Sequence, residues 1–164
     1  MICMARIDDR LIHGQVAVTW SKELNVSRII VASDAVAGNK IQVSALKMAA
    51  SAGVKAAILT CDKAVDILSD PRSAALRILL ISNDPTDLLR LFKRIPDRPV
   101  LDVANYGRIS GALSQKLKVS DSVYLTEGDE AVIRDIAGLG IEVIHQPLPS
   151  DSRKGLLELI DATK

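Results

Sequence analysis

Ten consecutive residues near the start of the chain, Arg6 to Gln15 (RIDDRLIHGQ), contain two arginines, two aspartates and a histidine. Phosphoryl transfer needs cationic hydrogen-bond donors, unpaired backbone N–H groups and, when the group is carried covalently, a nucleophile. Arg10 can donate two parallel hydrogen bonds to phosphoryl oxygens, and a neutral His13 is a competent nitrogen nucleophile. Gly14 stands at the expected start of a helix, where the first N–H groups can bind an anion. The stretch therefore predicts phosphoryl chemistry.

The protonation of His13 depends on neighbours that act in opposite directions. The helix start and Arg10 disfavour the imidazolium cation, whereas the carboxylate of Asp8 or Asp9 favours it. Because phosphoryl transfer relies mainly on positioning and charge stabilisation, one of these aspartates is expected to orient Arg10 or the loop rather than to act as a base. The residues alone leave two simpler interpretations open: His13 as a surface or capping residue, and Asp8–Arg10 as a solvated ion pair.

The elements that must position this stretch follow from the hydrophobic pattern. Short apolar runs alternate with longer amphipathic segments, and several runs are nearly continuous, which is typical of parallel strands covered by helices on both faces. The predicted strands are Ile2–Ile7, Arg28–Ala32, Lys55–Leu59, Arg77–Ile81, Val100–Val103, Ser122–Leu125 and Glu142–Ile144.

Helical spacing of apolar residues marks the segments 41–49, 88–95 and 133–137, and residues 156–162 are predicted as a short terminal helix. Asp84 before Pro85 and the Thr126–Asp129 pair are typical helix starts. The segment after His13 is ambiguous, because its apolar residues fit either the period of a strand or that of a helix. The whole pattern predicts one α/β domain with a mostly parallel sheet, in which ligands bind beyond the carboxyl ends of the strands.

Composition excludes several classes of protein. The formal net charge of +1 argues against a general nucleic-acid binder, and no apolar run is long enough to span a bilayer. The first residues do not have the pattern of a secretory signal. Cys3 and Cys61 are expected to be free thiols in a reducing compartment, and no cluster of cysteines or histidines indicates a metal site. Nucleotide-binding glycine motifs are absent as well, so a bound nucleotide cofactor is not implied.

The stretch ARIDDRLIHGQVAVTW closely resembles the signature of the IIB component of the mannose/fructose/sorbose family of the bacterial phosphoenolpyruvate-dependent sugar phosphotransferase system (PTS). Weaker family-like segments follow in the expected order: Ser33–Ala37, Asn105–Gly107, Gly140–Val143 and Gln146–Pro149. Two departures are Ser33, where the family usually has Asn, and Tyr106, where it has a small apolar residue; the role of Tyr106 is left open.

The resemblance assigns roles to the loop. It implies that His13 is the phosphohistidine nucleophile, that Arg10 binds the phosphoryl oxygens, and that Asp8 organises the loop around them. Further residues expected in or beside the phosphate-binding loop are Arg6, Asp9, Gly14, Gln15, Asp34 and Asn105. For Asp34 and Asn105 a role in a turn or cap is equally compatible with the sequence. His145, the only other histidine, is expected in a structural or surface role.

The resemblance also implies a fold and partners. The fold is a single IIB domain over residues 1–164: an open, mostly parallel twisted sheet of about seven strands with one antiparallel edge strand and helices on both faces, and with a helix after His13. The donor is a IIA component, the acceptor a hexose, and the membrane components IIC and IID hold the protein at the inner face of the membrane from the cytoplasm. No metal or nucleotide is needed, because the group arrives already activated. The sugar, the phosphorylated nitrogen and any homo-oligomer are not specified.

The main alternative is a binding module. In it the same loop grips a sugar phosphate or a regulatory partner without covalent transfer, and His13 only forms hydrogen bonds.

Overall fold

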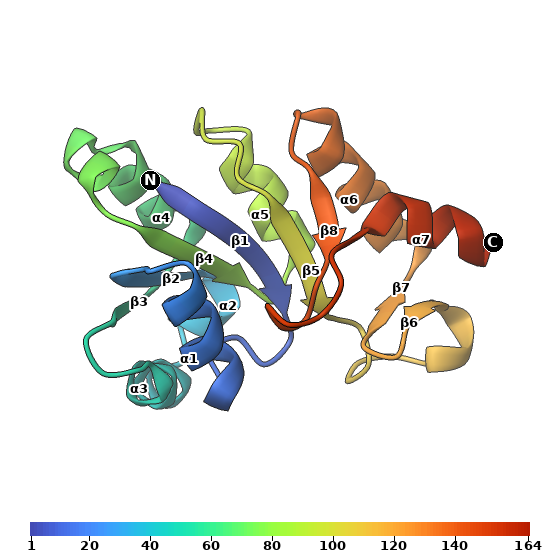
Figure 1. Ribbon diagram of the computed structural model, residues 1–164, viewed down its shortest axis with the longest axis horizontal. Coiled ribbons are helices and arrows are strands. Elements are labelled where there is room, and N and C mark those ends of the chain that lie inside the picture. The colour runs from blue at the N-terminus through green and yellow to red at the C-terminus, as the bar shows by residue number, and fades with distance from the viewer.

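A seven-stranded sheet in the order β3-β2-β4-β1-β5-β8-β9 forms the centre of the computed structural model, which describes residues 1–164 (Figure 1). All neighbouring strands are parallel except β8 and the edge strand β9, which are antiparallel. The strands are β1 (Ile2–Asp8), β2 (Arg28–Ala32), β3 (Lys55–Leu59), β4 (Ile78–Ser82), β5 (Leu101–Asn105), β8 (Val143–His145) and β9 (Lys154–Gly155). The predicted fold class is confirmed.

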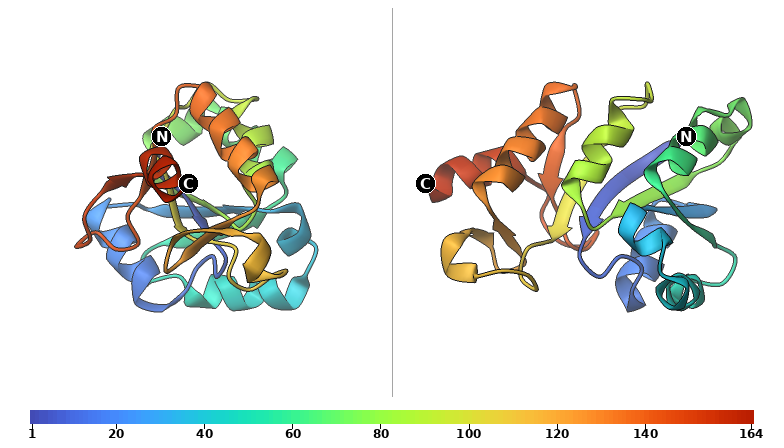
Figure 2. Two further views of the ribbon diagram at one scale, coloured as in Figure 1. Left: turned by 90° about the vertical axis from the view of Figure 1, so that its right-hand side faces the viewer. Right: turned by 180° about the vertical axis from the view of Figure 1, so that it is seen from behind.

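Helices cover both faces of this sheet (Figure 2, left). The helices are α1 (Gly14–Glu23), α2 (Asp34–Ala37), α3 (Lys40–Ala49), α4 (Cys61–Ser69), α5 (Pro85–Phe92), α6 (Glu127–Gly138) and α7 (Leu156–Thr163). Apolar residues of α1 and α3 pack with one face of the sheet, and those of α4, α5, α6 and α7 pack with the other. The segment after His13 is therefore a helix, as the family resemblance implied.

The apolar strands supply both cores at once. Along β4, Ile78 and Leu80 join the core beneath α4 and α5, whereas Leu79 and Ile81 join the core beneath α1. Successive side chains of a strand point to opposite faces, so a strand buried on both sides needs an unbroken apolar run. This is the physical reason for the sequence pattern.

One strand prediction needs correction. The segment predicted as a strand at 122–125 forms β7 (Val123–Leu125), but β7 pairs with β6 (Leu117–Ser120) in a separate antiparallel sheet. The seventh strand of the main sheet is β9, which is two residues long and too short to show a hydrophobic period. No helix combines the length and hydropathy needed to cross a bilayer.

Candidate active site

The loop between β1 and α1 lies at the carboxyl edge of the sheet, where β1 and β5 end together (Figure 1). Leu11 has a φ of 58°, a left-handed conformation that costs a non-glycine residue about 1–3 kcal/mol. Leu11 and Ile12 are both buried in the core beneath α1, and burial stabilises each by about 1.5–3 kcal/mol. The two apolar side chains therefore hold the strained turn in place and leave Arg10 and His13 on its outer side.

Asp8 fixes the imidazole of His13. Its Oδ2 atom lies 3.0 Å from Nε2 of His13, and its Oδ1 atom accepts a hydrogen bond of 2.9 Å from the backbone N–H of Arg10. Because a carboxylate can only accept, the proton of a neutral imidazole lies on Nε2 and the lone pair lies on Nδ1. Asp8 thus orients both the loop and the histidine, whereas the sequence predicted only the loop or Arg10 as its target.

Arg6 supports Asp8 from below. Its buried guanidinium lies 2.5 Å from Asp102 and 3.7 Å from Asp8, and its carbon Cζ lies 5.1 Å above the ring centre of Trp20. It also donates a hydrogen bond to the carbonyl oxygen of Pro147. Arg6 therefore connects the loop to the segment that follows β8. Because its guanidinium is held by these contacts, it has little freedom to bind a ligand.

Burial dominates the electrostatics beneath the loop. Desolvation raises the pKa of Asp102 to about 7, although the Arg6 guanidinium opposes that shift. Desolvation also lowers the pKa of Arg6, which the two carboxylates of Asp102 and Asp8 partly offset. Removing either member of such a buried pair leaves the other charge without compensation.

The start of α1 supplies free backbone donors. His13 is the N-cap residue and its side chain caps no N–H group, so the N–H groups of Gly14, Gln15 and Val16 have no partner within the helix. Gly14 has a φ of 41°, which favours glycine at this position. These amides, at the positive end of the helix dipole, can bind phosphoryl oxygens.

A cavity of about 470 Å³ opens beside the loop. His13 is not one of its lining residues, but its ring contacts Asp8, which is. The wall includes the predicted residues Arg6, Asp8, Asp9, Arg10 and Asn105, together with Val16, Arg108, Ile109, Ser122 and Pro147.

Arg10 and Arg108 are both free to bind a ligand in this cavity. Every other arginine of the chain donates a hydrogen bond to a carboxylate or carbonyl oxygen. The side chains of Arg10 and Arg108 form none, although both are exposed and line the same cavity. The sequence pattern did not single out Arg108; its position directly after the Asn105–Gly107 motif was the available signal.

Asp9 holds the segment that carries Arg108. Its Oδ2 atom accepts a hydrogen bond of 2.8 Å from the N–H of Gly107, and Lys116 donates one of 2.7 Å to the carbonyl oxygen of Gly107. Partial burial is the largest cause of the raised pKa of Asp9. Nearby, the hydroxyl of Tyr106 donates to Asp129 at 3.0 Å, which gives this departure from the family pattern an anchoring role on α6.

Gly107→Ala tests this arrangement. Gly107 has a φ of 86°, and an added Cβ atom would collide with the carbonyl oxygen of Tyr124. We expect the free energy of unfolding to fall by about 2 kcal/mol or more, measured by urea denaturation. Gly138→Ala, at a position with open space for a Cβ atom and no positive φ, is the matched control. Equal stability of the two variants would contradict the tight approach to Tyr124.

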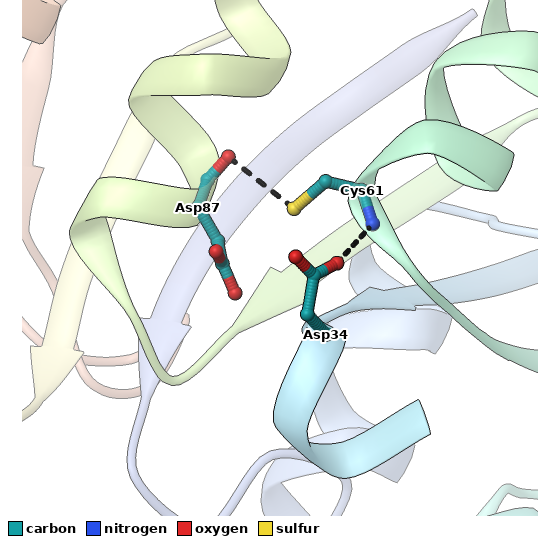
Figure 3. Close-up of side chains that lie close together, drawn as sticks. All are labelled: Asp34, Cys61 and Asp87. Atoms are coloured by element: carbon teal, nitrogen blue, oxygen red, sulfur yellow. Dashed lines mark hydrogen bonds between the residues drawn. The ribbon is translucent and has the colours of Figure 1, made fainter. Parts of the chain in front are cut away.

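Asp34 lies in a different cluster, with Cys61 and Asp87 (Figure 3). Its carboxylate accepts a hydrogen bond of 2.8 Å from the N–H of Cys61 and pairs with Arg90 at 2.8 Å. Arg90 also lies 3.3 Å from Asp87, and burial raises the pKa of the Cys61 thiol to about 11. A guanidinium between two carboxylates and a protonated thiol disfavour a metal ion, so the cluster ties α2, α4 and α5 together. None of these contacts of Asp34 involves the phosphoryl loop.

Comparison with known proteins places this site in a family. Residues 2–164 match the family of PTS system sorbose subfamily IIB components. The chain belongs to this family. A probable phosphotransferase enzyme IIB component of Streptococcus pyogenes is 37% identical over 163 residues, which cover 98% of this chain and 100% of that protein. The mannose-specific EIIAB component of Escherichia coli is 35% identical over 160 residues, 98% of this chain and 48% of that protein.

The IIB fold is shared as well. The IIBSor domain of the sorbose permease from Klebsiella pneumoniae matches the whole chain with a TM-score of 0.91 at 29% identity, and 98% of that domain is covered. The IIB chain spans about half the length of the E. coli EIIAB protein. As a IIB component, the protein is a phosphotransferase of a sugar phosphotransferase system, as the resemblance implied.

Proposed function

We propose that this IIB component carries a phosphoryl group on Nδ1 of His13, takes it from the phosphohistidine of a IIA component, and passes it to a hexose entering through IIC and IID. The observation that carries the proposal is the 3.0 Å contact between Asp8 and Nε2 of His13. It keeps the proton on Nε2 and leaves the lone pair of Nδ1 for attack.

The proposed transfer balances without a cofactor. The Nδ1 lone pair of His13 forms a bond to phosphorus as the bond from phosphorus to the donor imidazole breaks, and that electron pair returns to the donor ring. The proton on Nε2 stays in place, and the Asp8 carboxylate offsets the positive charge that develops on the ring. In the transfer to the sugar, a hexose hydroxyl oxygen forms a bond to phosphorus and its proton passes to solvent. The bond from phosphorus to Nδ1 breaks, and its electron pair returns to the ring, so His13 leaves as a neutral imidazole with its proton on Nε2.

Charge stabilisation of the transferring group comes from the loop and its neighbours. Arg10 and Arg108 line the cavity beside the loop, and they and the free N–H groups of α1 are the proposed donors to the three anionic oxygens. Such preorganised donors are the main source of catalysis in phosphoryl transfer. Arg6 and Asp9 act by holding Asp8 and the Arg108 segment. The proposal includes a single IIB domain over residues 1–164, at work on the cytoplasmic face of the membrane.

The decisive experiment measures covalent labelling. The chain is incubated with labelled phosphoenolpyruvate, the general phosphotransfer proteins and a IIA component. The wild type and the control Lys93→Met, at an exposed position, should acquire an acid-labile label, and His13→Ala should acquire none. Labelling of His13→Ala at the wild-type rate would refute the role of His13. Saturable binding of a sugar phosphate without any adduct on the wild type would instead support the non-covalent module.

Arg108→Ala is expected to slow phosphorylation by phospho-IIA about ten- to a hundredfold, because a charge-assisted hydrogen bond contributes about 1.5–3 kcal/mol. Arg108→Lys keeps the charge but loses the planar fork, so it should recover only part of the rate. The measurement is the initial labelling rate in rapid-quench experiments. Arg72→Ala, at an exposed arginine paired with Asp70, is the control. An Arg108→Ala rate equal to that of the control would exclude Arg108 from the site.

A further inference from the structure

A second cavity, of about 360 Å³, lies beside the first. Ser122 and Pro147 line both cavities, so they form a shared wall. The remaining lining residues of the second cavity are all polar, and they include Ser120, Ser152, His145, Asp151 and Lys154. The roles assigned above to the phosphoryl loop use none of these side chains.

His145 lines this cavity and has one ring nitrogen without a partner in the protein. The side chain is buried, with 8% exposed, at the end of β8. Nδ1 lies 2.6 Å from the carbonyl oxygen of Val103, which can only accept, so Nδ1 carries a proton. Nε2 has no partner in the protein, and His145 lines the cavity. Nε2 is not among the fully buried atoms that lack a partner, so solvent or a ligand in the cavity can reach it and form a hydrogen bond.

Lys154 stands next to His145 on the same face. The two residues are directly paired in the antiparallel β8–β9 ladder, and side chains of such a pair project to the same side at about 5 Å. The ammonium group of Lys154 has no carboxylate partner. The site therefore combines the unpaired ring nitrogen of a neutral imidazole, which accepts, with an ammonium donor.

The mixture of groups indicates the class of ligand. A bare anion requires donors, and the carboxylates of Asp121 and Asp151 in the wall oppose it. A metal ion requires converging ligands, and the group of such residues that converges in this chain is the Asp34 cluster. A polyhydroxylated molecule both donates and accepts through each hydroxyl, which matches the hydroxyl of Ser152 alongside the carboxylates, His145 and Lys154. The hydroxyl of Ser122 already donates to the carbonyl oxygen of Ala104 and contacts that of Ser120, so these two serines offer mainly lone pairs.

We propose that the second cavity binds the hydroxyl groups of the hexose while its reacting hydroxyl, or its phosphate after transfer, lies in the first cavity. This inference rests on the proposed function, because the shared wall of Ser122 and Pro147 places one cavity next to the transferring group. It adds a sugar-recognition site on the IIB component itself, with His145 and Lys154 as its polar contacts.

The test uses the purified chain labelled with ¹⁵N and monitored by NMR. The probes are mannose 6-phosphate, fructose 1-phosphate and inorganic phosphate. At least one hexose phosphate should shift the amides of Ser120, His145 and Lys154 together with those of the loop, whereas inorganic phosphate should leave these three amides unchanged. An equal response of the second cavity to inorganic phosphate overturns the proposal.

Two substitutions measure the separate contributions of His145 and Lys154 to the binding of a hexose phosphate. His145→Asn keeps a donor for the carbonyl oxygen of Val103 but removes Nε2, and Lys154→Met keeps the aliphatic stem. Each should weaken the binding of the responding hexose phosphate about tenfold, the loss of one good hydrogen bond, with no change in the affinity for inorganic phosphate. Lys93→Met is the matched control, and thermal unfolding verifies that each variant is folded.

The outcomes are separable from those of the labelling experiment. If the wild type is phosphorylated on His13 but neither hexose phosphate shifts the second cavity, this inference fails and the phosphocarrier role stands. If the wild type is not phosphorylated by phospho-IIA, the phosphocarrier role itself fails. If His145→Asn and Lys154→Met weakened the binding of all three probes equally, the substitutions would have a general structural effect. That result would also overturn the proposed sugar site.

Discussion

Asp8→Asn is expected to reduce the rate of phosphorylation of His13 by at least about a hundredfold while the chain stays folded. The amide group that replaces the carboxylate can donate a hydrogen bond to Nε2, which would move the imidazole proton to Nδ1 and block the attacking nitrogen. A misdirected histidine tautomer costs other enzymes up to about 10⁴-fold in rate. Rapid-quench labelling by phospho-IIA measures the effect.

The nitrogen that carries the phosphoryl group provides an independent check of Asp8. Two-dimensional ¹⁵N NMR of the phosphorylated wild type should show the phosphoryl group on Nδ1 and the proton on Nε2. Asp135→Asn, on the exposed side of α6, serves as a control of equal chemistry and should match the wild type. A phosphoryl group on Nε2, or full activity of Asp8→Asn, would contradict the role that the 3.0 Å contact assigns to Asp8.

Asp102→Ala is expected to have the largest effect on stability among the substitutions considered. It leaves the buried guanidinium of Arg6 without its 2.5 Å partner, and breaking such a pair costs about 3–5 kcal/mol. Urea denaturation followed by circular dichroism measures the loss. The double variant Arg6→Met with Asp102→Leu should be more stable than Asp102→Ala, because both members of the pair are gone and the buried carboxylate of Asp8 keeps its contacts with Arg10 and His13. If Asp102→Ala were as stable as the wild type, the stabilising role of the buried pair would be contradicted.

The pH dependence of unfolding has a defined sign for Asp102. Its pKa is raised to about 7 in the folded chain, whereas an exposed aspartate has a value of about 3.9. Between these values the folded chain holds a proton that the unfolded chain has released. This group therefore lowers the free energy of unfolding as pH rises from about 4 to 7. The double variant Arg6→Met with Asp102→Leu should lack this contribution to the free energy of unfolding. The same pH profile in the double variant and the wild type would contradict the raised pKa of Asp102.

Much of the fold was predictable because the relevant interactions are local. The unbroken apolar runs follow from burial on two faces, and the starts of α5 and α6 follow from Asp84 before Pro85 and from the capping box of Thr126 and Asp129. The pairing of β7 with β6, and the short edge strand β9, depend on contacts between distant segments. Periodicity within a single segment does not contain that information.

The site divides in the same way. His13, Arg10 and the free start of α1 were predictable from ten consecutive residues and from the family resemblance. Asp102, which lies 96 residues from its partner Arg6, and Arg108 were not, since only the side-by-side arrangement of β1 and β5 brings them to the loop. The second contact of Asp8, with the imidazole, depends on the left-handed turn at Leu11. Leucine rarely adopts a positive φ, so the sequence around Leu11 does not predict this turn.

Leu11 and Ile12 keep the turn in its shape whether or not a phosphoryl group is present, because both side chains are packed in the apolar core beneath α1. Under the proposed function, the phosphoryl donor and the sugar acceptor would consequently meet a loop of the same shape. Little reorganisation of the loop is therefore expected when a phosphoryl group is loaded or discharged. The turnover of the carrier would then be limited by the rates at which the proposed partners associate and dissociate.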